Sequence, residues 1–454
     1  MRRLNVAVLA LVLAVSAMAL ATIVGPGARA SSTVSFTNFV LTPTGNGTGD
    51  SEPAVTIGPQ GDVVLGGLDW FQFQTDVWKG TFGSAPTAVG PIDAHIGTGI
   101  GGGDEDLDLG STGTLHASTL MFIFNPTLKA AQLGVSAISC PNFAAASDFS
   151  GCTAKLIDTT QADRQWITSD GPTVYISYHD SGSSTLIHVQ RSLDDGVTWT
   201  RVGDPIVGQD GVTGASTFNN DQGQLVADPT THDVFAVFAA GQPGIQKGTS
   251  ANFNNIYVSR STDMGLTWKA NLVYHAPLFT ALNNVFPMLA VDPENGNLYA
   301  AWSDAHSVSV SASTDHGVSW SKPVAVNTGD AVTAVFPAVA ARDGLVDVAY
   351  YGTTAASKDD PSAAWNTYMA QSTDGGLTWT QSVVSDHENH VGVICTSGTG
   401  CANPLVTRTL LDLFEISINA QGKAAVIYTD DTLATFVSGG TTYPLPQVIV
   451  GYQS

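Results

Sequence analysis

The chain has 454 residues, of which 39 are acidic and 17 basic, so its formal net charge at neutral pH is −22. A charge of this sign disfavours nucleic acids and anionic membrane surfaces as partners, and it suits calcium and neutral or basic ligands. Only 12% of the residues are charged and 47 are glycine, which is typical of many short strands and tight turns rather than of helices.

The first 30 residues are expected to be a secretory signal peptide. Arg2 and Arg3 precede an apolar run over residues 4–24, and small residues at 28 and 30 offer a cleavage site. A retained membrane anchor is the alternative, because the apolar run is long enough to cross a bilayer. Cleavage removes three arginines and leaves residues 31–454 with a net charge of −25. No second apolar run of that length follows, so the mature chain is expected to be secreted and extracellular, without a membrane span.

After residue 50, the same order of strands and turns can be read repeatedly. In the clearest unit, two apolar runs flank Asn295-Gly296, a strong hairpin signal, and a third strand follows near Val308. Seven units of this kind can be read. Their inner strands are expected to begin near Glu52, Asp104, Asp163, Gln222, Phe286, Phe336 and Leu413.

Four units end in the same motif, Ser-x-Asp-x-Gly-x-(Thr/Ser)-Trp. Its copies begin at Ser192, Ser261, Ser313 and Ser372. The Asp carboxylate can accept hydrogen bonds from the backbone N–H groups of a tight turn, and the Gly supplies the backbone freedom that the turn needs. The Thr or Ser restarts a strand, and the Trp is expected to anchor this strand in a core. Recurrence of the motif indicates a repeat protein.

This motif resembles the Asp box, or BNR repeat, of the sialidase superfamily, and the chain resembles secreted bacterial sialidase-like BNR-repeat proteins. The resemblance implies a single all-β propeller over residues 31–454, with the boxes on the face away from the active site. Sialidases have six blades, but the seven units favour seven four-stranded blades, with six as the alternative. The box also occurs in propellers that are not enzymes, so function must be argued from a site.

The last unit provides only three strands of its own. A ring of blades must leave no loose edge, so an N-terminal strand over residues 35–41 is expected to pair with residues 448–452 and close the last blade.

The four cysteines fall into two close pairs. In a secreted chain this spacing predicts the disulfides Cys140–Cys152 and Cys395–Cys401. A zinc site of four thiolates is the less favoured alternative, since no two of these cysteines are separated by only two residues. Each pair lies in a long insertion, at residues 130–155 and 382–410, of the kind that often forms a functional loop.

Blade geometry predicts which residues meet at the channel mouth. The starts of first strands and the ends of second strands lie on the face opposite the repeated motifs. Carboxylates and aromatic residues dominate these positions, and such a concave mouth is the default hypothesis for a binding site. The alternative is that each Asp carboxylate only accepts hydrogen bonds from backbone N–H groups near it in the chain.

Roles are assigned to these residues as hypotheses. The candidates for acid, base or transition-state roles are Asp104, Asp106, Asp163, Arg164, Asp180, Asp304 and Tyr351. The candidates for ligand binding are Trp70, Trp166, His179, Asp221, Tyr350, Arg408 and Asp430. The alternating acids Asp104, Asp106 and Asp108 can supply calcium ligands, although they match no EF-hand loop.

The resemblance also defines what an active sialidase needs: three arginines for the sialate carboxylate, a Tyr with a Glu partner, and an Asp acid/base. Only Arg164 and Arg408 are expected at the mouth, and the rim is acidic. We therefore expect a monomeric propeller that acts on or binds an extracellular glycan or glycoprotein, with glycoside hydrolysis by a pair of carboxyl groups if it is an enzyme. A non-catalytic binding or scaffold propeller with structural calcium is the alternative, and a genuine exo-α-sialidase is the second alternative.

Overall fold

The computed structural model describes residues 34–41, 43, 49–93, 100–125, 129–180, 186–206, 220–241 and 253–454. The expected signal peptide lies outside them. Among the described residues, no helix has the length and apolar character needed to span a bilayer.

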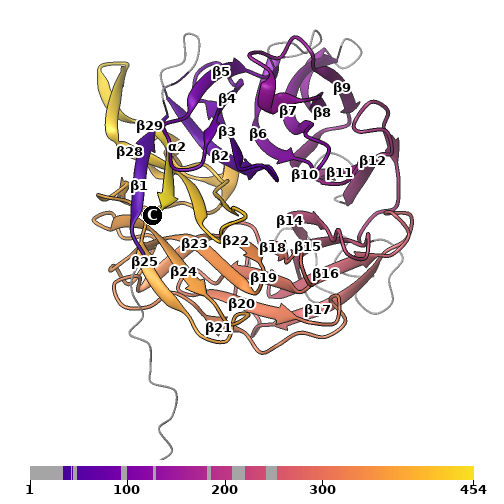
Figure 1. The fold of residues 1–454 in the computed structure, drawn as a ribbon. Coiled ribbons are helices and arrows are strands. Elements are labelled where there is room, and N and C mark those ends of the chain that lie inside the picture. The colour runs from indigo at the N-terminus through magenta and orange to yellow at the C-terminus, as the bar shows by residue number, and fades with distance from the viewer. Residues whose placement is uncertain are drawn as a thin grey trace, which may run out of the picture. The chain divides into compact units, whose positions relative to one another are not determined.

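Seven antiparallel sheets follow one another in chain order around a ring, which makes a seven-bladed β-propeller (Figure 1). Blade 1 consists of β2 (Asp50–Ile57), β3 (Asp62–Asp69), β4 (Thr75–Thr81) and β5 (Thr87–Pro91), and blade 2 of β6 (Ile100–Leu109), β7 (Leu115–Asn125), β8 (Ala130–Cys140) and β9 (Thr153–Asp158). Blade 3 consists of β10 (Ala162–Asp170), β11 (Thr173–Asp180), β12 (Ile187–Ser192) and β13 (Thr200–Arg201), and blade 4 of β14 (Asn220–Ala227), β15 (Val234–Ala240), β16 (Asn255–Ser261) and β17 (Lys269–His275).

Blade 5 consists of β18 (Met288–Val291), β19 (Leu298–Ser303), β20 (Val308–Ser313) and β21 (Val324–Ala325). Blade 6 consists of β22 (Thr333–Arg342), β23 (Leu345–Thr353), β24 (Ala364–Ser372) and β25 (Thr380–Val383), with β26 (His390–Val391) also paired to β24. The last blade consists of β27 (Glu415–Ile418), β28 (Ala424–Ser438), β29 (Thr441–Gln453) and β1 (Phe36–Val40). The described helices are single turns: η2 (Phe143–Ala145), η3 (Gly398–Gly400) and α2 (Pro404–Thr407). The prediction of seven blades is confirmed.

The repeated motifs form the turns between the third and fourth strands of four blades. In one of them Asp263 Oδ1 accepts a hydrogen bond from Thr267 N at 2.8 Å, and its Oδ2 accepts one from Thr267 Oγ1 at 2.6 Å. Ser261 Oγ accepts a further bond from Gly265 N at 2.8 Å, a role for the serine that the sequence did not suggest. The other three motifs repeat these bonds.

The motif tryptophans are half-buried rather than fully enclosed. Trp268 packs against the main core, and its Nε1 donates to the carbonyl of Gly265 at 3.0 Å. Trp199 and Trp379 make the same bond within their own turns. The motifs also contact the first turn of the preceding blade, as Asp195 does when it accepts a hydrogen bond from Thr114 Oγ1 at 2.6 Å. They therefore share the face of the turns between first and second strands.

The N-terminal strand closes the last blade as predicted. β1 lies along β29, with Phe36 opposite Gln453 and Val40 opposite Ile449 (Figure 1). Leu41 continues this pairing through a backbone hydrogen bond to Val448 and is only 2% exposed.

Removal of the residues before Thr42 is expected to lower the free energy of unfolding by at least about 3 kcal/mol, because it removes the buried Leu41 and two half-buried phenylalanines from the packing of the last blade and opens a sheet edge. Leu41→Ala should reproduce much of this loss, about 2–5 kcal/mol. Val40→Ala is the matched control, since Val40 is 53% exposed and should change stability by less than about 0.5 kcal/mol. Thermal unfolding measures all three. An unchanged melting temperature after the deletion would show that the last blade does not need β1.

Candidate functional site

A cavity of about 740 Å³ opens on the face opposite the repeated motifs. It lies at the ends of β3 and β7, at the starts of β2, β6 and β10, and against the segment around α2. Both charged and aromatic residues line it. The charged residues are Glu52, Asp104, Asp163, Arg164, Arg408 and Asp412, and the aromatic ones are Trp70, Phe71, Phe73 and Phe122.

Bulges in the inner strands aim the charged side chains into this cavity. The pairing of inner and second strands shifts register on either side of Glu52, Asp104 and Arg164. These three residues also have positive φ angles of 51°, 34° and 57°. Such conformations are costly for residues with a Cβ and cluster at functional sites, and a bulge re-aims a side chain. The backbone of three successive blades is therefore strained where it presents charge to one cavity.

Arg164 is the central cation of the cluster. Its Nη1 lies 3.9 Å from Asp221 Oδ1 and its Nη2 lies 3.9 Å from Asp412 Oδ2. The guanidinium also lies over the ring of Phe286, 4.5 Å from its centroid, a cation–π contact. The ion pairs are long and a quarter of the side chain is exposed, so the guanidinium still has donors for a ligand.

The second disulfide loop covers Arg164. A Cβ at Gly398, where φ is +54°, would come within 3.1 Å of Arg164 Nη2, so glycine allows the loop to approach this closely. Arg408, just after α2, donates to Asp412, and the backbone N of Asp412 donates to Glu52 Oε1 at 3.0 Å. The insertion over residues 382–410 thus supplies one wall of the cavity.

Several carboxyl groups around Arg164 have a raised pKa and therefore keep their protons at pH values where an exposed carboxyl group is ionised. Burial, and then the charge of Glu52, raises the pKa of Asp104 well above its usual range, while Arg164 opposes the shift. Burial and the neighbouring Asp104 raise the pKa of Asp163 to about 7. Burial raises the pKa of Asp221 to about 6. Protonated and ionised carboxyl groups therefore lie side by side near neutral pH, the condition for acid–base work and for donating hydrogen bonds to hydroxyls.

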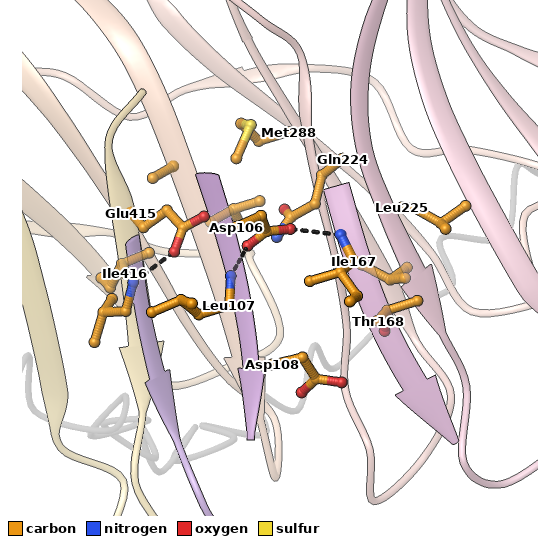
Figure 2. A pocket seen from close by; sticks show the side chains of 14 residues that line it. Asp106, Leu107, Asp108, Ile167, Thr168, Gln224, Leu225, Met288, Glu415 and Ile416 are labelled. Atoms are coloured by element: carbon orange, nitrogen blue, oxygen red, sulfur yellow. Dashed lines mark hydrogen bonds between the residues drawn. The ribbon is translucent and has the colours of Figure 1, made fainter. Parts of the chain in front are cut away.

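A smaller cavity of about 150 Å³ lies deeper, along the inner strands (Figure 2). Asp106 Oδ2 accepts a hydrogen bond from Ile167 N at 2.7 Å, and Glu415 Oε2 accepts one from Val55 N at 2.7 Å. The two carboxyl groups also hydrogen-bond each other. Burial raises the pKa of Asp106 to about 7 and that of Glu415 well above its usual range, so the pair shares a proton. Asp108 lies apart from this pair and bonds to Ser169.

The three residues expected to hold calcium therefore have three different neighbourhoods. Asp104 faces the large cavity, Asp106 is bonded to Glu415, and Asp108 to Ser169. Among the described residues, these three do not place their oxygens within 4.8 Å of one another, whereas another group of three aspartates in blade 1 does.

Three aromatic residues expected at the mouth are in the core instead. Trp166 is 1% exposed and packs edge-on against Phe286. Tyr351 is 1% exposed, and its hydroxyl accepts a hydrogen bond from Thr429 N at 2.9 Å. Tyr350 is fully buried and donates to Gln381. Their strands place these rings between neighbouring blades. Trp166 is therefore not accessible for stacking on a ligand, and Tyr351 is not accessible to assist catalysis.

The other candidates lie around the rim with local partners. Asp304 accepts hydrogen bonds from His306 N and Ser307 N, so its carboxylate satisfies the backbone N–H groups of its own turn. Asp180, next to His179, pairs with His188, and Asp430 accepts a hydrogen bond from Thr432 N at 2.8 Å. None of these four residues lines the large cavity. Trp70, Asp104, Asp163, Arg164 and Arg408 do, and Asp221 pairs with Arg164.

Both predicted disulfides are present, Cys140–Cys152 and Cys395–Cys401. Of the six arginines after the expected signal peptide, all within the described residues, Arg164 and Arg408 reach the cavity. The other four pair elsewhere: Arg191 with the carbonyl of Met264, Arg201 with Asp204, Arg260 with Asp233 and Arg342 with Glu294.

No protein-family model matches the chain, and no curated protein does. Solved structures do match it. An ulvan lyase, a polysaccharide lyase, has 10% sequence identity and a TM-score of 0.50 over 92% of this chain and 94% of its own. A protein of unknown function from Dyadobacter fermentans has 14% identity and a TM-score of 0.49 over 92% and 98%. A Hadza microbial sialidase has 12% identity and a TM-score of 0.47 over 86% and 73%. At such identities the likeness is one of fold alone.

Proposed function

We propose that the chain is a secreted, monomeric propeller that binds an extracellular glycan in the 740 Å³ cavity. One observation carries the proposal: aromatic residues line a single cavity together with arginines and with carboxyl groups whose pKa is raised. Sugars present apolar C–H faces and rings of hydroxyl groups. Aromatic side chains suit the first, and mixed donors and acceptors suit the second.

The balance of charge in the cavity favours a neutral sugar. Two arginines meet five carboxyl groups, Glu52, Asp104, Asp163, Asp221 and Asp412. Since burial raises the pKa of several of these groups, the site approaches neutrality by holding protons rather than by adding cations. An anionic sugar would compete with the ionised carboxylates for the same guanidinium groups.

Hydrolysis is the second candidate function, favoured by the hydrogen bond between the carboxyl groups of Asp104 and Glu52, which requires that one of them holds a proton. A glycosidase needs one protonated and one ionised carboxyl group beside the scissile bond. Asp104 as the acid and Asp163 as its ionisable neighbour supply that combination. The ulvan lyase with the same fold acts on a polysaccharide, but fold does not decide function, so the proposal rests on the cavity.

Binding to an array of neutral oligosaccharides, followed by titration calorimetry with the tightest ligand, tests the proposal. Trp70→Ala is expected to weaken binding about tenfold, because stacking on an aromatic ring is lost. The matched control is Phe279→Ala, which removes a ring that is 78% exposed and lies outside the cavity. New reducing ends in the bound oligosaccharide, lost in Asp104→Asn, would identify a hydrolase. An array without signal, or equal affinities in Trp70→Ala and the wild type, would rule out glycan binding at this cavity.

A further inference from the structure

Three neighbouring strands of blade 1 each bring one aspartate to the same point. Asp50 on β2 lies opposite Asp69 on β3, and Asp76 is near the start of β4, which pairs with β3. One carboxylate oxygen of each lies within 4.8 Å of those of the other two. All three residues are at most 2% exposed.

The carboxylate of Asp50 has nothing in the protein to bind. Both of its oxygens are buried and have no hydrogen-bond partner, although the residue is only 1% exposed. Nearby, Asp93 is 3% exposed; its Oδ1 accepts a hydrogen bond from Thr75 N at 3.1 Å, while its Oδ2 is buried without a partner. Buried carboxylate oxygens without partners are costly, and such groups are rare unless a cation or a proton satisfies them.

The charges around Asp50 increase this cost. Burial, followed by the charges of Asp76 and Asp69, raises the pKa of Asp50 to about 9. Burial also raises the pKa of the adjacent Asp93 to about 6. A divalent cation at this point would replace the proton and remove the repulsion among the carboxylates.

We propose that blade 1 binds one calcium ion between Asp50, Asp69 and Asp76. Calcium takes six to eight oxygen ligands at about 2.3–2.6 Å, so two ligands of one ion can lie up to about 5 Å apart, and the three carboxylate oxygens of this cluster lie within 4.8 Å of one another. Magnesium demands near-ideal octahedral geometry and usually keeps several waters, so a site built from three protein carboxylates favours calcium. Zinc prefers nitrogen and sulfur ligands, and none belongs to this group.

The ion would also support one wall of the large cavity. Asp69 Oδ1 accepts hydrogen bonds from Phe71 N at 2.9 Å and Gln72 N at 2.6 Å, so this carboxylate holds the turn that carries Trp70, Phe71 and Phe73. A calcium ion bound to Asp69 would fix the anchor of this turn. The calcium site needs no glycan, so its test is independent of the proposed function.

Calcium itself is the probe. The full chain is stripped with a chelator, dialysed against micromolar calcium, and its metal content is measured. We expect one ion per chain, and a rise in melting temperature of about 3 °C when calcium is added at a hundred times its dissociation constant. Asp50→Asn keeps the shape of the side chain and should lose both the ion and the shift. Asp359→Asn is the control, because it removes the same charge from a side chain that is 68% exposed.

Three results would overturn the assignment. The wild type could retain no calcium and show no shift, which would mean that protons satisfy the cluster. Asp50→Asn could bind calcium as the wild type does, which would place the ion elsewhere. Magnesium could produce an equal shift at equal concentration, which would contradict the assignment of the site to calcium. If Asp50→Asn does not fold, Asp76→Asn provides the same comparison from the neighbouring strand.

Discussion

The protein is expected to unfold at a higher temperature at pH 5 than at pH 8. Burial raises the pKa of Asp106, Asp163 and Asp347 to about 7 each, well above that of an exposed carboxyl group. Between pH 4 and 7 the folded chain therefore holds more protons than the unfolded chain. Since stability rises with pH only where the unfolded state binds more protons, here it must fall as the pH rises through this window.

Each of these buried carboxyl groups is expected to make a large contribution to the loss of stability between pH 5 and pH 8. A pKa that rises from 3.8 to about 7 corresponds to roughly 4 kcal/mol at a pH above both values, as an upper estimate for one buried carboxyl group. Calorimetric unfolding in chelator between pH 5 and 8 measures the sum. A melting temperature that increases from pH 5 to pH 8 would contradict the protonation of these groups.

Asp347 isolates the effect, because it lies away from both cavities. It accepts a hydrogen bond from Gln371 Nε2 at 2.9 Å, and its other oxygen is buried without a partner. Asp347→Asn should raise the melting temperature at pH 8, where the aspartate is ionised, and change it little at pH 5. Asp386→Asn is the matched control, since that side chain is 67% exposed and should show no such pH dependence.

Arg164→Ala is expected to abolish ligand binding in the large cavity and to destabilise the fold by about 3–5 kcal/mol at pH 8, because it leaves buried carboxylates without their cation. At pH 5 the loss should be smaller, since Asp163 and Asp221 then take up protons. Arg342→Ala is the control. It removes a half-exposed arginine paired with Glu294, a contact worth about 0–1 kcal/mol.

The same variant tests the sialidase alternative. We expect purified protein to release little or no chromophore from an aryl sialoside, because two arginines rather than three reach the cavity. The missing charge-assisted contact is worth about 1.5–3 kcal/mol, and the acidic neighbours add repulsion. Robust turnover that Arg164→Ala abolishes would restore the sialidase interpretation.

The repeats, the closing strand and the disulfides could be predicted because each is a local or pairwise pattern in the sequence. The repeated motif carries its own hydrogen bonds, so Asp263 and Gly265 specify the turn wherever it occurs. A ring without a loose edge then required a donor for β29, and only the segment before residue 42 remained. Because successive strands of a blade run in opposite directions, the sequence also predicts which residues lie on the face opposite the repeated motifs. Asp104, Arg164 and Arg408 were predicted on this face, and they line one cavity there.

The details of the site depend on features that no local pattern reveals. The bulges at Glu52 and Arg164 shift the strand register, so alternation along the strand does not predict which side chain enters the cavity. Tyr350 and Tyr351 looked equally available at a strand end, yet both are enclosed between blades. The bond between Asp106 and Glu415 joins the second and last blades, and the cluster around Asp50 depends on the register of three strands.

The closing pair of strands also sets the order in which the protein can be completed. Phe36 on β1 lies opposite Gln453 on β29, so the last blade cannot form until the whole intervening chain has been synthesised. Contacts of such long sequence separation form slowly, and an open blade exposes unpaired strand edges in the meantime. A chain that crosses a membrane unfolded reaches this step only on the far side, where both disulfides can also form. Folding of the ring and oxidation of its two insertions would then be completed together.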